Sequence, residues 1–346
     1  MPPARGPRHG VDILFLTQTY PRTPEDSSGP FIRELARALV RGGDRVRVLA
    51  PHTRGLPARR VDDGVEVETF RYAPAPLEIF GYGRSLAADE EVRAGALLMA
   101  PLYALGAWRA VRRAVRRSAA MGGRGRPLPL EGQGDGGIGV ECIQAHWLLP
   151  NGPLARGLAS RLPFGIGIHG SDVFLAERRL ARPWVRRTLA GASFVTGCSP
   201  ELVDRVCALG YDREQARVIP YGVDADAFRP DPARRHLWRQ RLGIPAEAPL
   251  LLGLGRMATK KGFQVLLPEL PALLAALPAA HVVLAGAGDL LPRFRAQAAP
   301  LAGRVHFPGA VLRDTLPDLF RAADAFVLPA VHDRRGNVDG LPNVVL

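Results

Sequence analysis

One strand–helix–strand succession near the N-terminus constrains the fold more than any other feature. Residues 11–16 form a short apolar run, and residues 31–40 then carry apolar side chains at a helical period. Gly42 and Gly43 end that pattern, and residues 45–50 form a second apolar run. Two strands joined by a helix lie parallel, because a tight hairpin connects only antiparallel strands. The pattern therefore predicts an α/β fold built on a parallel sheet.

A second set of the same elements occupies the C-terminal part of the chain. Residues 250–254 form an apolar run, and a helical pattern at residues 262–277 leads to the next one. A proline-rich stretch, residues 220–249, separates the two sets. We expect two Rossmann-like, doubly wound domains that face a cleft, with residues 1–220 in the first and residues 221–346 in the second. Further strands are expected at residues 65–70, 141–145, 164–168, 194–196, 281–285, 305–307 and 325–328.

The middle of the first domain changes character along the chain. Residues 86–117 have a helical pattern, whereas residues 118–139 are rich in glycine, proline and arginine. Because such a composition cannot build a packed core, we expect a disordered surface insertion at residues 118–139. The longest apolar run, residues 94–108, is too short to span a bilayer and contains Pro101.

Composition excludes some classes of function. The net charge is +13, and all 46 basic residues except Lys260 and Lys261 are arginine, a bias that weakens any argument from arginine count. No zinc-finger spacing or RNA-binding motif is present, so we expect no nucleic-acid partner. The three cysteines form no C-x-x-C pair and predict free thiols in a reducing cytosol. The N-terminus lacks the apolar region of a signal peptide, so we expect a cytoplasmic protein.

Two cations flank the turn after the first strand of the second set. Arg256 comes just after that strand, and Lys261 precedes the predicted helix. A helix N-terminus with flanking cations suits a diphosphate, and a compact ammonium fits where a broad guanidinium does not. A solvated basic loop explains the same residues, and the local sequence leaves both interpretations open.

Glycines follow the next strand of the second set. Gly286 and Gly288 would let a ligand approach the backbone closely, although a strand-to-helix turn uses glycine in any case. No G-x-G-x-x-G follows the first strand of either set, which argues against a nicotinamide dehydrogenase. Near the end of the chain, Asp339 stands beside Gly340 and Leu341. Its carboxylate could accept hydrogen bonds from sugar hydroxyls, although an ordinary turn explains the same residues.

Polar and aromatic residues end two strands of the first set. His169 ends one strand, three residues before Asp172, and His146 with Trp147 ends another. His146 and Trp147, together with Asn151 at the start of the next helix, could hold a sugar or simply fill the edge of the core. A helix cap formed near Asp172, with His169 packed in the core, is the alternative that these residues alone favour.

The motifs occur in a definite order along the chain. They are Ser28-Gly29-Pro30, Ala145-His146-Trp147, Pro150-Asn151-Gly152, His169-Gly170-Ser171-Asp172, Pro220-Tyr221-Gly222-Val223-Asp224 with Phe228, Gly255-Arg256, Lys261-Gly262, Gly286-Ala287-Gly288 and Asp339-Gly340-Leu341-Pro342. The combination resembles the retaining glycosyltransferases of family 4, which have the GT-B fold. The resemblance extends over residues 11–346, and the combination is more specific than any single motif.

The resemblance implies transfer of a sugar from a nucleotide-diphosphate sugar, with UDP or GDP as the expected nucleotide. It implies retention of the anomeric configuration by front-face displacement, without a metal or other cofactor. The catalytic residues that it implies are His169, Arg256, Lys261 and Asp339. The donor would lie at Gly29, Gly255, Gly286, Gly288, Gly340 and Leu341, and the acceptor at His146, Trp147, Asn151 and Asp172. Arg256 and Lys261 would stabilise the charge of the departing nucleoside diphosphate.

The sequence departs from the family pattern at two places. Asp339 stands where the family has the first of two glutamates, and the second would fall just after Leu346. We therefore expect a C-terminally truncated chain with an incomplete second domain and weak or absent activity.

The acceptor is expected to be a glycan or a lipid-linked sugar in the synthesis of a cell-surface polysaccharide or glycolipid. Residues 108–117 form a densely basic helical segment, which suits an anionic membrane surface, at the inner face of the plasma membrane, or simply a solvated face. Two alternatives remain open. One is a non-catalytic protein that binds nucleotide sugars or anionic membranes. The other is a GT-B sugar-nucleotide epimerase, for which no proton-transferring carboxylates are identified.

Overall fold

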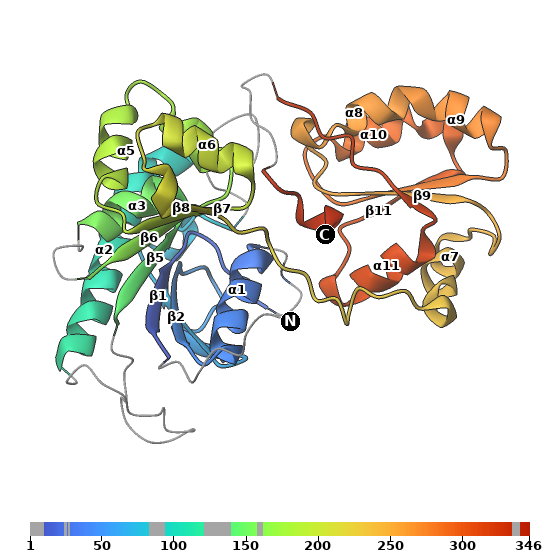
Figure 1. Ribbon diagram of the computed structural model, residues 1–346. Coiled ribbons are helices and arrows are strands. Elements are labelled where there is room, and N and C mark those ends of the chain that lie inside the picture. Colours follow the sequence, from blue (N-terminus) through green and yellow to red (C-terminus); the bar gives the residue numbers. More distant parts are fainter. Residues whose placement is uncertain are drawn as a thin grey trace. The chain divides into compact units, whose positions relative to one another are not determined.

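The chain forms two compact units. The computed structural model describes residues 10–23, 26, 28–82, 94–120, 140–157, 162–333 and 340–346. Among them, the chain up to Tyr221 forms unit 1, except Thr23 and Asp26, which belong with the chain from Gly222 onward to unit 2 (Figure 1). Of the predicted surface insertion, residues 118–120 continue a helix, and residues 121–139 lie outside the described part.

Unit 1 is built on one sheet, of eight strands within the described residues. The strand order is β3-β4-β2-β1-β5-β6-β7-β8, and every pair is parallel except β3 with β4. The strands are β1 (Asp12–Leu16), β2 (Arg45–Pro51), β3 (Arg59–Asp62), β4 (Val65–Phe70), β5 (Cys142–His146), β6 (Phe164–Ile168), β7 (Phe194–Gly197) and β8 (Ala216–Val218). The predicted strands are confirmed, whereas β3 and β8 were not expected.

Helices cover both faces of this sheet. The helices are α1 (Pro30–Arg41), α2 (Ala94–Ala120), α3 (Leu148–Arg156), α4 (Ser171–Ala176), α5 (Arg182–Leu189) and α6 (Pro200–Ala208). Figure 1 shows α1 on one face of the sheet and α2 with α3 on the other. From β1 the sheet grows in two directions, through β2 and β4 on one side and through β5 to β8 on the other. Because each crossover between parallel strands is right-handed, the helices of these two halves lie on opposite faces of the sheet. Beneath α1, Ile32 and Ala36 pack on Phe15 and Val48 of β1 and β2.

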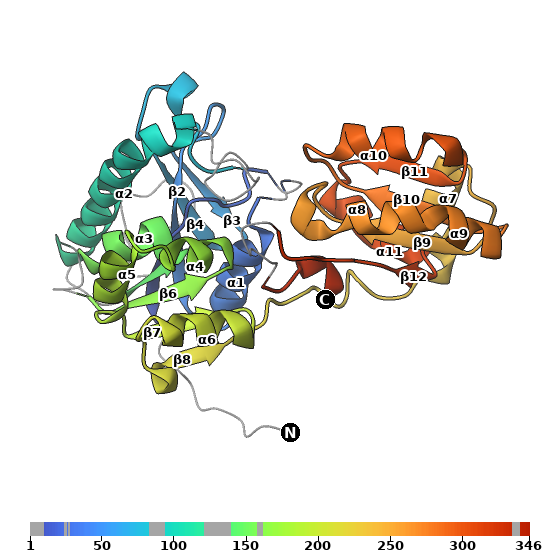
Figure 2. The ribbon, with the colours of Figure 1, turned by 90° about the horizontal axis from the view of Figure 1, so that it is seen from above.

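Unit 2 repeats this plan with a four-stranded parallel sheet of order β11-β10-β9-β12 in the described residues. Its strands are β9 (Leu250–Leu254), β10 (His281–Ala285), β11 (Val305–Gly309) and β12 (Ala325–Phe326). Its helices are α7 (His236–Leu242), α8 (Phe263–Leu266), α9 (Leu270–Ala276), α10 (Leu291–Gln297) and α11 (Leu316–Ala322). One apolar cluster, including Phe263 and Phe294, contains residues of α8 to α10, and another, including Trp238 and Leu319, contains residues of α7 and α11. Figure 2 shows these helices around the unit 2 sheet.

The helix predicted at residues 262–277 is interrupted. A 3₁₀ segment, Leu267–Glu269, separates α8 from α9. Pro268 and Pro271 cause the interruption, because proline has no N–H to donate into the helical ladder. The prediction of one continuous helix at this place was therefore wrong.

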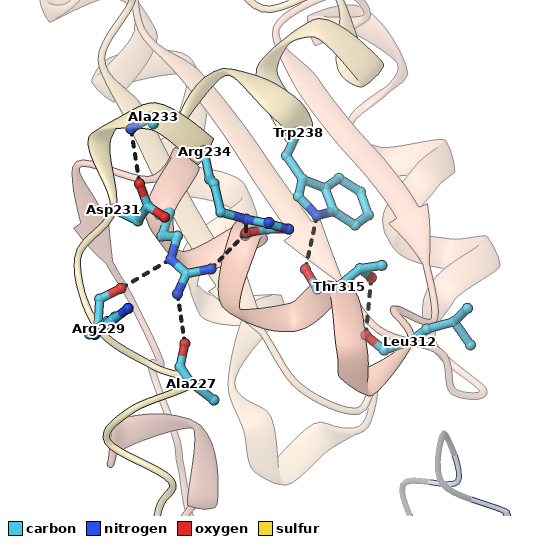
Figure 3. Close-up of polar contacts among 10 residues, drawn as sticks. Ala227, Arg229, Asp231, Ala233, Arg234, Trp238, Leu312 and Thr315 are labelled. Atoms are coloured by element: carbon cyan, nitrogen blue, oxygen red, sulfur yellow. Dashed lines mark hydrogen bonds and ion pairs between the residues drawn. The ribbon is translucent and has the colours of Figure 1, made fainter.

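The chain after Gly222 is attached firmly to unit 2. The Arg321 guanidinium of α11 donates to the carbonyl oxygens of Ala227 at 2.7 Å and Arg229 at 3.0 Å (Figure 3). Arg234 donates twice to the Asp318 carboxylate, at 2.6 and 2.7 Å. From Gly222 onward, the proline-rich stretch is thus a structural part of unit 2.

Candidate functional site

In unit 2, the loops at the carboxyl ends of β9 and β10 are joined by backbone hydrogen bonds. The Gly255 N–H donates to the Ala285 carbonyl at 3.0 Å, and the Met257 N–H donates to the Ala287 carbonyl at 2.9 Å. The Leu290 N–H returns a bond to the Met257 carbonyl at 3.1 Å. Parallel strands present their carboxyl ends at one edge, which is where ligands of such sheets bind.

Two of the predicted donor glycines make this close approach of loops possible. Gly286 has φ +135°, and a Cβ there would lie 1.8 Å from the Gly255 carbonyl oxygen. Gly288 has φ +154°, and a Cβ there would lie 2.5 Å from the Met257 carbonyl oxygen. Both positions therefore require glycine for contact between the loops themselves, whether or not a ligand approaches.

The two predicted diphosphate-binding cations lie in the β9 loop and are partly exposed. Arg256 directly follows Gly255, and the aliphatic chain of Lys261 lies across Gly255, with its Cδ 3.4 Å from where a Cβ would be. Lys261 ends a 3₁₀ turn, Thr259–Lys261, and α8 begins two residues later. Because α8 has only four residues, its dipole is weak, so attraction for an anion must come mainly from the side-chain charges.

A third loop, after β12, adjoins the same place. The Val331 N–H donates to the Lys260 carbonyl at 3.0 Å, and a Cβ on Gly262 would lie 1.5 Å from the Pro329 carbonyl oxygen. The predicted catalytic residue Asp339 lies outside the described residues. Gly340 and Leu341 are partly buried.

In unit 1, two predicted residues and Tyr221 form a hydrogen-bonded chain of rings. His146 Nδ1 lies 3.1 Å from His169 Nε2, and His169 Nδ1 lies 2.8 Å from the Tyr221 hydroxyl. Phe31 of α1 stacks on Tyr221 with 4.5 Å between ring centroids, and Trp147 lies 4.8 Å from the His169 ring. These groups come from β5, β6, α1 and the end of unit 1.

His146 and His169 are both uncharged at neutral pH. Burial lowers the pKa of His146 to about 3, and burial together with the neighbouring His146 lowers the pKa of His169 well below its usual range. A neutral imidazole has one donor and one acceptor nitrogen. The hydrogen bonds among His146, His169 and Tyr221 must therefore all point in the same direction. His146 Nε2 is buried and has no hydrogen-bond partner among the described residues. This part of unit 1 therefore suits recognition of hydroxyl groups rather than of phosphates.

Asp172 holds the loops around these histidines. Its carboxylate accepts the N–H groups of Leu148 at 2.7 Å, Gly170 at 3.0 Å and His169 at 3.1 Å. Burial raises the pKa of the Asp172 carboxyl, against the lowering effect of these backbone hydrogen bonds. The carboxylate receives N–H groups that precede it, whereas a helix N-cap would receive N–H groups that follow it. Asp172 thus joins the β5 and β6 loops and is buried beneath the surface.

The other predicted acceptor residues are also mostly buried. Asn151 is fully buried, where its amide donates to the His146 carbonyl at 2.8 Å and accepts from the Tyr103 hydroxyl at 2.9 Å. Trp147 has φ +69°, which is strained for a side chain of this size, and strained residues are concentrated at functional sites. The predicted donor residue Gly29 is buried before α1 at φ +70°. A Cβ at this position would lie 3.1 Å from Thr19 Cγ2.

Sequence reasoning missed the partners that fix this group. Tyr221 was part of a recognised motif but had no expected contact, and Phe31 and Tyr103 were not expected at the site. The position of Phe31 at the start of α1 could have indicated that it lies at the site. Tyr103 lies in an apolar run whose pattern predicts only a helix. No group of three or more histidine, cysteine or acidic side chains that could hold a metal ion occurs in the described parts of the two units. No described helix combines the length and the apolar character needed to cross a membrane.

Comparison with protein families gives two matches that together span most of the chain. The profile described as Glycosyltransferase Family 4 matches residues 29–227, and the profile described as Glycosyl transferases group 1 matches residues 248–346.

Relatives are similar over different shares of the chain. A GDP-mannose-dependent alpha-(1-6)-phosphatidylinositol monomannoside mannosyltransferase of Mycobacterium tuberculosis is 33% identical over 217 residues, 60% of this chain and 56% of that protein. The chain thus spans about half the length of this relative. The teichuronic acid biosynthesis glycosyltransferase TuaC of Bacillus subtilis is 25% identical over 97% of this chain and 78% of its own length.

Solved structures share the fold. Sucrose-phosphate synthase from Thermosynechococcus elongatus superposes with a TM-score of 0.67 at 18% identity, over 96% of this chain and 77% of the other. Anabaena HepE in complex with UDP and glucose gives a TM-score of 0.61 at 20% identity, over 92% and 74%. The expected two-domain GT-B architecture is confirmed.

Proposed function

The chain belongs to glycosyltransferase family 4, and on that premise we propose that it transfers a sugar from a nucleoside-diphosphate sugar to a glycan or lipid-linked acceptor. The observation that carries the proposal is the set of hydrogen-bonded loops at the carboxyl edge of the unit 2 sheet. There a glycine-lined backbone presents two half-buried cations, Arg256 and Lys261, from a single loop.

The donor diphosphate is proposed to bind at these cations. Arg256 would donate to phosphate oxygens through its planar fork, and Lys261 would add a compact charge that the Gly255 backbone leaves room for. As the bond to the sugar breaks, negative charge grows on the departing diphosphate, and these two fixed cations stabilise it. This step uses positions already set by the backbone contacts of Gly286 and Gly288.

The sugar hydroxyls are proposed to meet the neutral ring chain of unit 1. Both ring nitrogens of His169 have partners in this structure, so a sugar hydroxyl would bind the ring by replacing the Tyr221 hydroxyl. Asp172 and Asn151, which hold the surrounding backbone, act as positioning residues for that exchange. Retention by front-face displacement without a metal is part of the same proposal, as is a sugar-binding role for Asp339.

A relative from Mycobacterium tuberculosis is named as GDP-mannose-dependent, and HepE was solved with UDP and glucose. We therefore propose UDP or GDP as the nucleotide and a glycolipid or cell-surface polysaccharide as the product. The basic part of α2 supports a cytoplasmic protein held peripherally at the inner face of the plasma membrane.

The first experiment measures binding of UDP, GDP, ADP and dTDP by thermal shift and calorimetry. One diphosphate should bind, and Arg256→Ala should weaken it by roughly tenfold to a hundredfold, because a charged hydrogen bond contributes about 1.5–3 kcal/mol. Lys260→Ala is the matched control, since it removes one adjacent charge from the same loop and should change the affinity about threefold at most. Equal affinities of wild type and Arg256→Ala would disprove the assigned donor site.

Sugar transfer is then followed with UDP-glucose and GDP-mannose and a lipid-linked acceptor. Formation of a glycosylated acceptor supports an enzyme. Tight nucleotide binding without any transfer would favour a non-catalytic nucleotide-sugar-binding protein instead.

A further inference from the structure

An arginine-lined pocket lies in unit 1, away from the ring chain of histidines. It forms where the second half of α2 passes the β3–β4 hairpin, and its volume is about 700 Å³. Ligand pockets of proteins commonly have volumes of about 300–1,000 Å³. Its arginines are Arg59, Arg71, Arg109, Arg112, Arg113 and Arg116.

The charge of this pocket is not balanced by the residues that line it. Glu68 is the one carboxylate among them, and it already accepts from Arg117 at 2.9 Å and faces Arg59 at 3.8 Å. Among the described residues, no carboxylate lies within ion-pair distance of Arg109, Arg113 or Arg116. Arg71 faces Glu78 at 3.5 Å. The guanidinium groups that α2 contributes keep the cavity positively charged, which favours an anion.

Helix spacing makes this arrangement unfavourable for the isolated chain. Arg109 and Arg113 lie four residues apart, as do Arg112 and Arg116, and like charges at that spacing destabilise a helix. Arg112 is held over the Trp108 ring at 5.0 Å, which orders its guanidinium at the pocket. A bound anion would remove the repulsion and use the ordered guanidinium.

The arginine-rich composition does not account for the cluster. Other arginines of the described residues have a partner inside the fold, which is a carboxylate for Arg33 and Arg37, both paired with Asp62. Asp318 accompanies Arg234 and Arg321 in the same way. The α2 arginines differ because they are exposed and grouped around a cavity.

The same face of α2 is apolar in its first half. Leu98, Leu102 and Leu105 are exposed by 72%, 41% and 42%. They continue into Arg109, Arg112 and Arg116 at alternating spacings of three and four residues, which keeps all six on one stripe of the helix. The opposite stripe, with Ala107, Ala110, Val111 and Ala114, is buried against the unit. The exposed stripe thus joins leucines to guanidinium groups, the combination that an interfacial helix presents to lipid.

We propose that this pocket binds the phosphate of an anionic phospholipid headgroup while the leucines of α2 enter the adjoining apolar layer. Guanidinium forks match phosphate oxygens in pairs, and several of them around one cavity favour a group with more than one charged oxygen. The inference rests on the proposed function in one respect: lipid binding would hold unit 1 at the membrane surface that carries a lipid-linked acceptor. The binding itself can be measured without any sugar transfer.

The test is co-sedimentation of the full chain with phosphatidylcholine vesicles, with and without phosphatidylglycerol, at low salt. The chain should sediment with the anionic vesicles only. The double variant Arg112→Gln/Arg116→Gln should bind these vesicles about tenfold more weakly or worse, since each basic side chain near such a surface contributes on the order of 1 kcal/mol. Arg229→Gln/Arg293→Gln removes the same charge from exposed positions of unit 2 and should change binding about twofold at most.

A second pair of variants identifies the source of the phosphate. Leu102→Gln/Leu105→Gln should also weaken vesicle binding, because the lipid proposal requires both halves of the stripe. If this variant binds like wild type while inorganic diphosphate displaces the chain, the pocket serves a free phosphate compound and the lipid assignment is wrong. Equal losses in the pocket variant and the unit 2 control would also overturn it, as would sedimentation of wild type with neutral vesicles.

UDP and GDP binding separates this proposal from the proposed function. The pocket variant should retain wild-type nucleotide affinity and a wild-type circular dichroism spectrum. Vesicle binding without nucleotide binding would refute the donor site alone, whereas nucleotide binding without vesicle binding would refute the pocket alone.

Discussion

Replacement of Gly286 by alanine tests the backbone contact on which the donor site depends. The added methyl group would lie 1.8 Å from the Gly255 carbonyl oxygen, so the two loops must separate by more than an ångström. Alanine at φ +135° adds strain of order 1–3 kcal/mol, and the collision adds about 1–3 kcal/mol. We therefore expect a loss of about 4 kcal/mol in the stability of unit 2. For a unit of this size each kcal/mol shifts Tm by roughly 3–5 °C, so its Tm should fall by roughly 15 °C.

Nucleotide binding should suffer as well, because Arg256 follows the displaced Gly255. Loss of one charged hydrogen bond to the diphosphate weakens binding by roughly tenfold to a hundredfold. Differential scanning calorimetry measures the first effect, and isothermal titration with UDP and GDP below the lowered Tm measures the second.

Gly243→Ala is the control for strain alone. Gly243 has φ +66°, but a Cβ there would meet nothing within 4 Å. This variant should lose about 1–2 kcal/mol and bind nucleotide as wild type does. If Gly286→Ala and Gly243→Ala have the same Tm, the close contact of the loops is wrong. If it melts early but binds nucleotide normally, the contact stands and the donor site does not.

Two further substitutions test the carboxylates that hold each unit. Asp172→Asn puts an amide N–H₂ where the carboxylate accepts N–H groups, so unit 1 should lose about 2–4 kcal/mol in urea unfolding; a loss below about 0.5 kcal/mol would contradict the assignment. The hydrogen bond from Arg234, followed by that from Arg321, lowers the pKa of Asp318 from 3.8 to about 2. Because the folded pKa is the lower one, its stabilisation is essentially complete above about pH 5 and is lost as pH falls towards 2. Unfolding of unit 2 between pH 5 and pH 2 should therefore be less pH-dependent in Asp318→Asn, and an unchanged profile would exclude the ion pair.

The sequence predicts the two sheets well where strands are buried. Residues 250–254 and 281–285 are recognised to the residue because each is a continuous apolar run that ends at a small residue or a glycine loop. Strand β3 escapes prediction because Arg59, Arg60 and Asp62 give it the composition of a loop, and only its pairing with β4 makes it a strand. Edge strands of this kind owe their structure to a partner that the local sequence does not contain.

The candidate site is predictable only in part, for the same physical reason. Gly286 and Gly288 could be recognised, since a turn that needs positive φ selects glycine. The contact between His169 and Tyr221 joins residues far apart in the chain and depends on the packed fold. The role of Asp172 was similarly ambiguous, because its partner Leu148 lies at the end of a different strand.

The contacts of residues 227–234 with α11 leave a short segment of chain between two fixed points. Tyr221 is held to unit 1 by His169 and Phe31, and Ala227 is held to unit 2 by Arg321. Between them, the Asp224 side chain accepts the N–H groups of residues 226 and 227 and forms a closed turn. Gly222 and Val223, both exposed, lie between these two attachments. The Tyr221 hydroxyl that His169 binds is therefore only a few residues along the chain from the first residue that α11 holds.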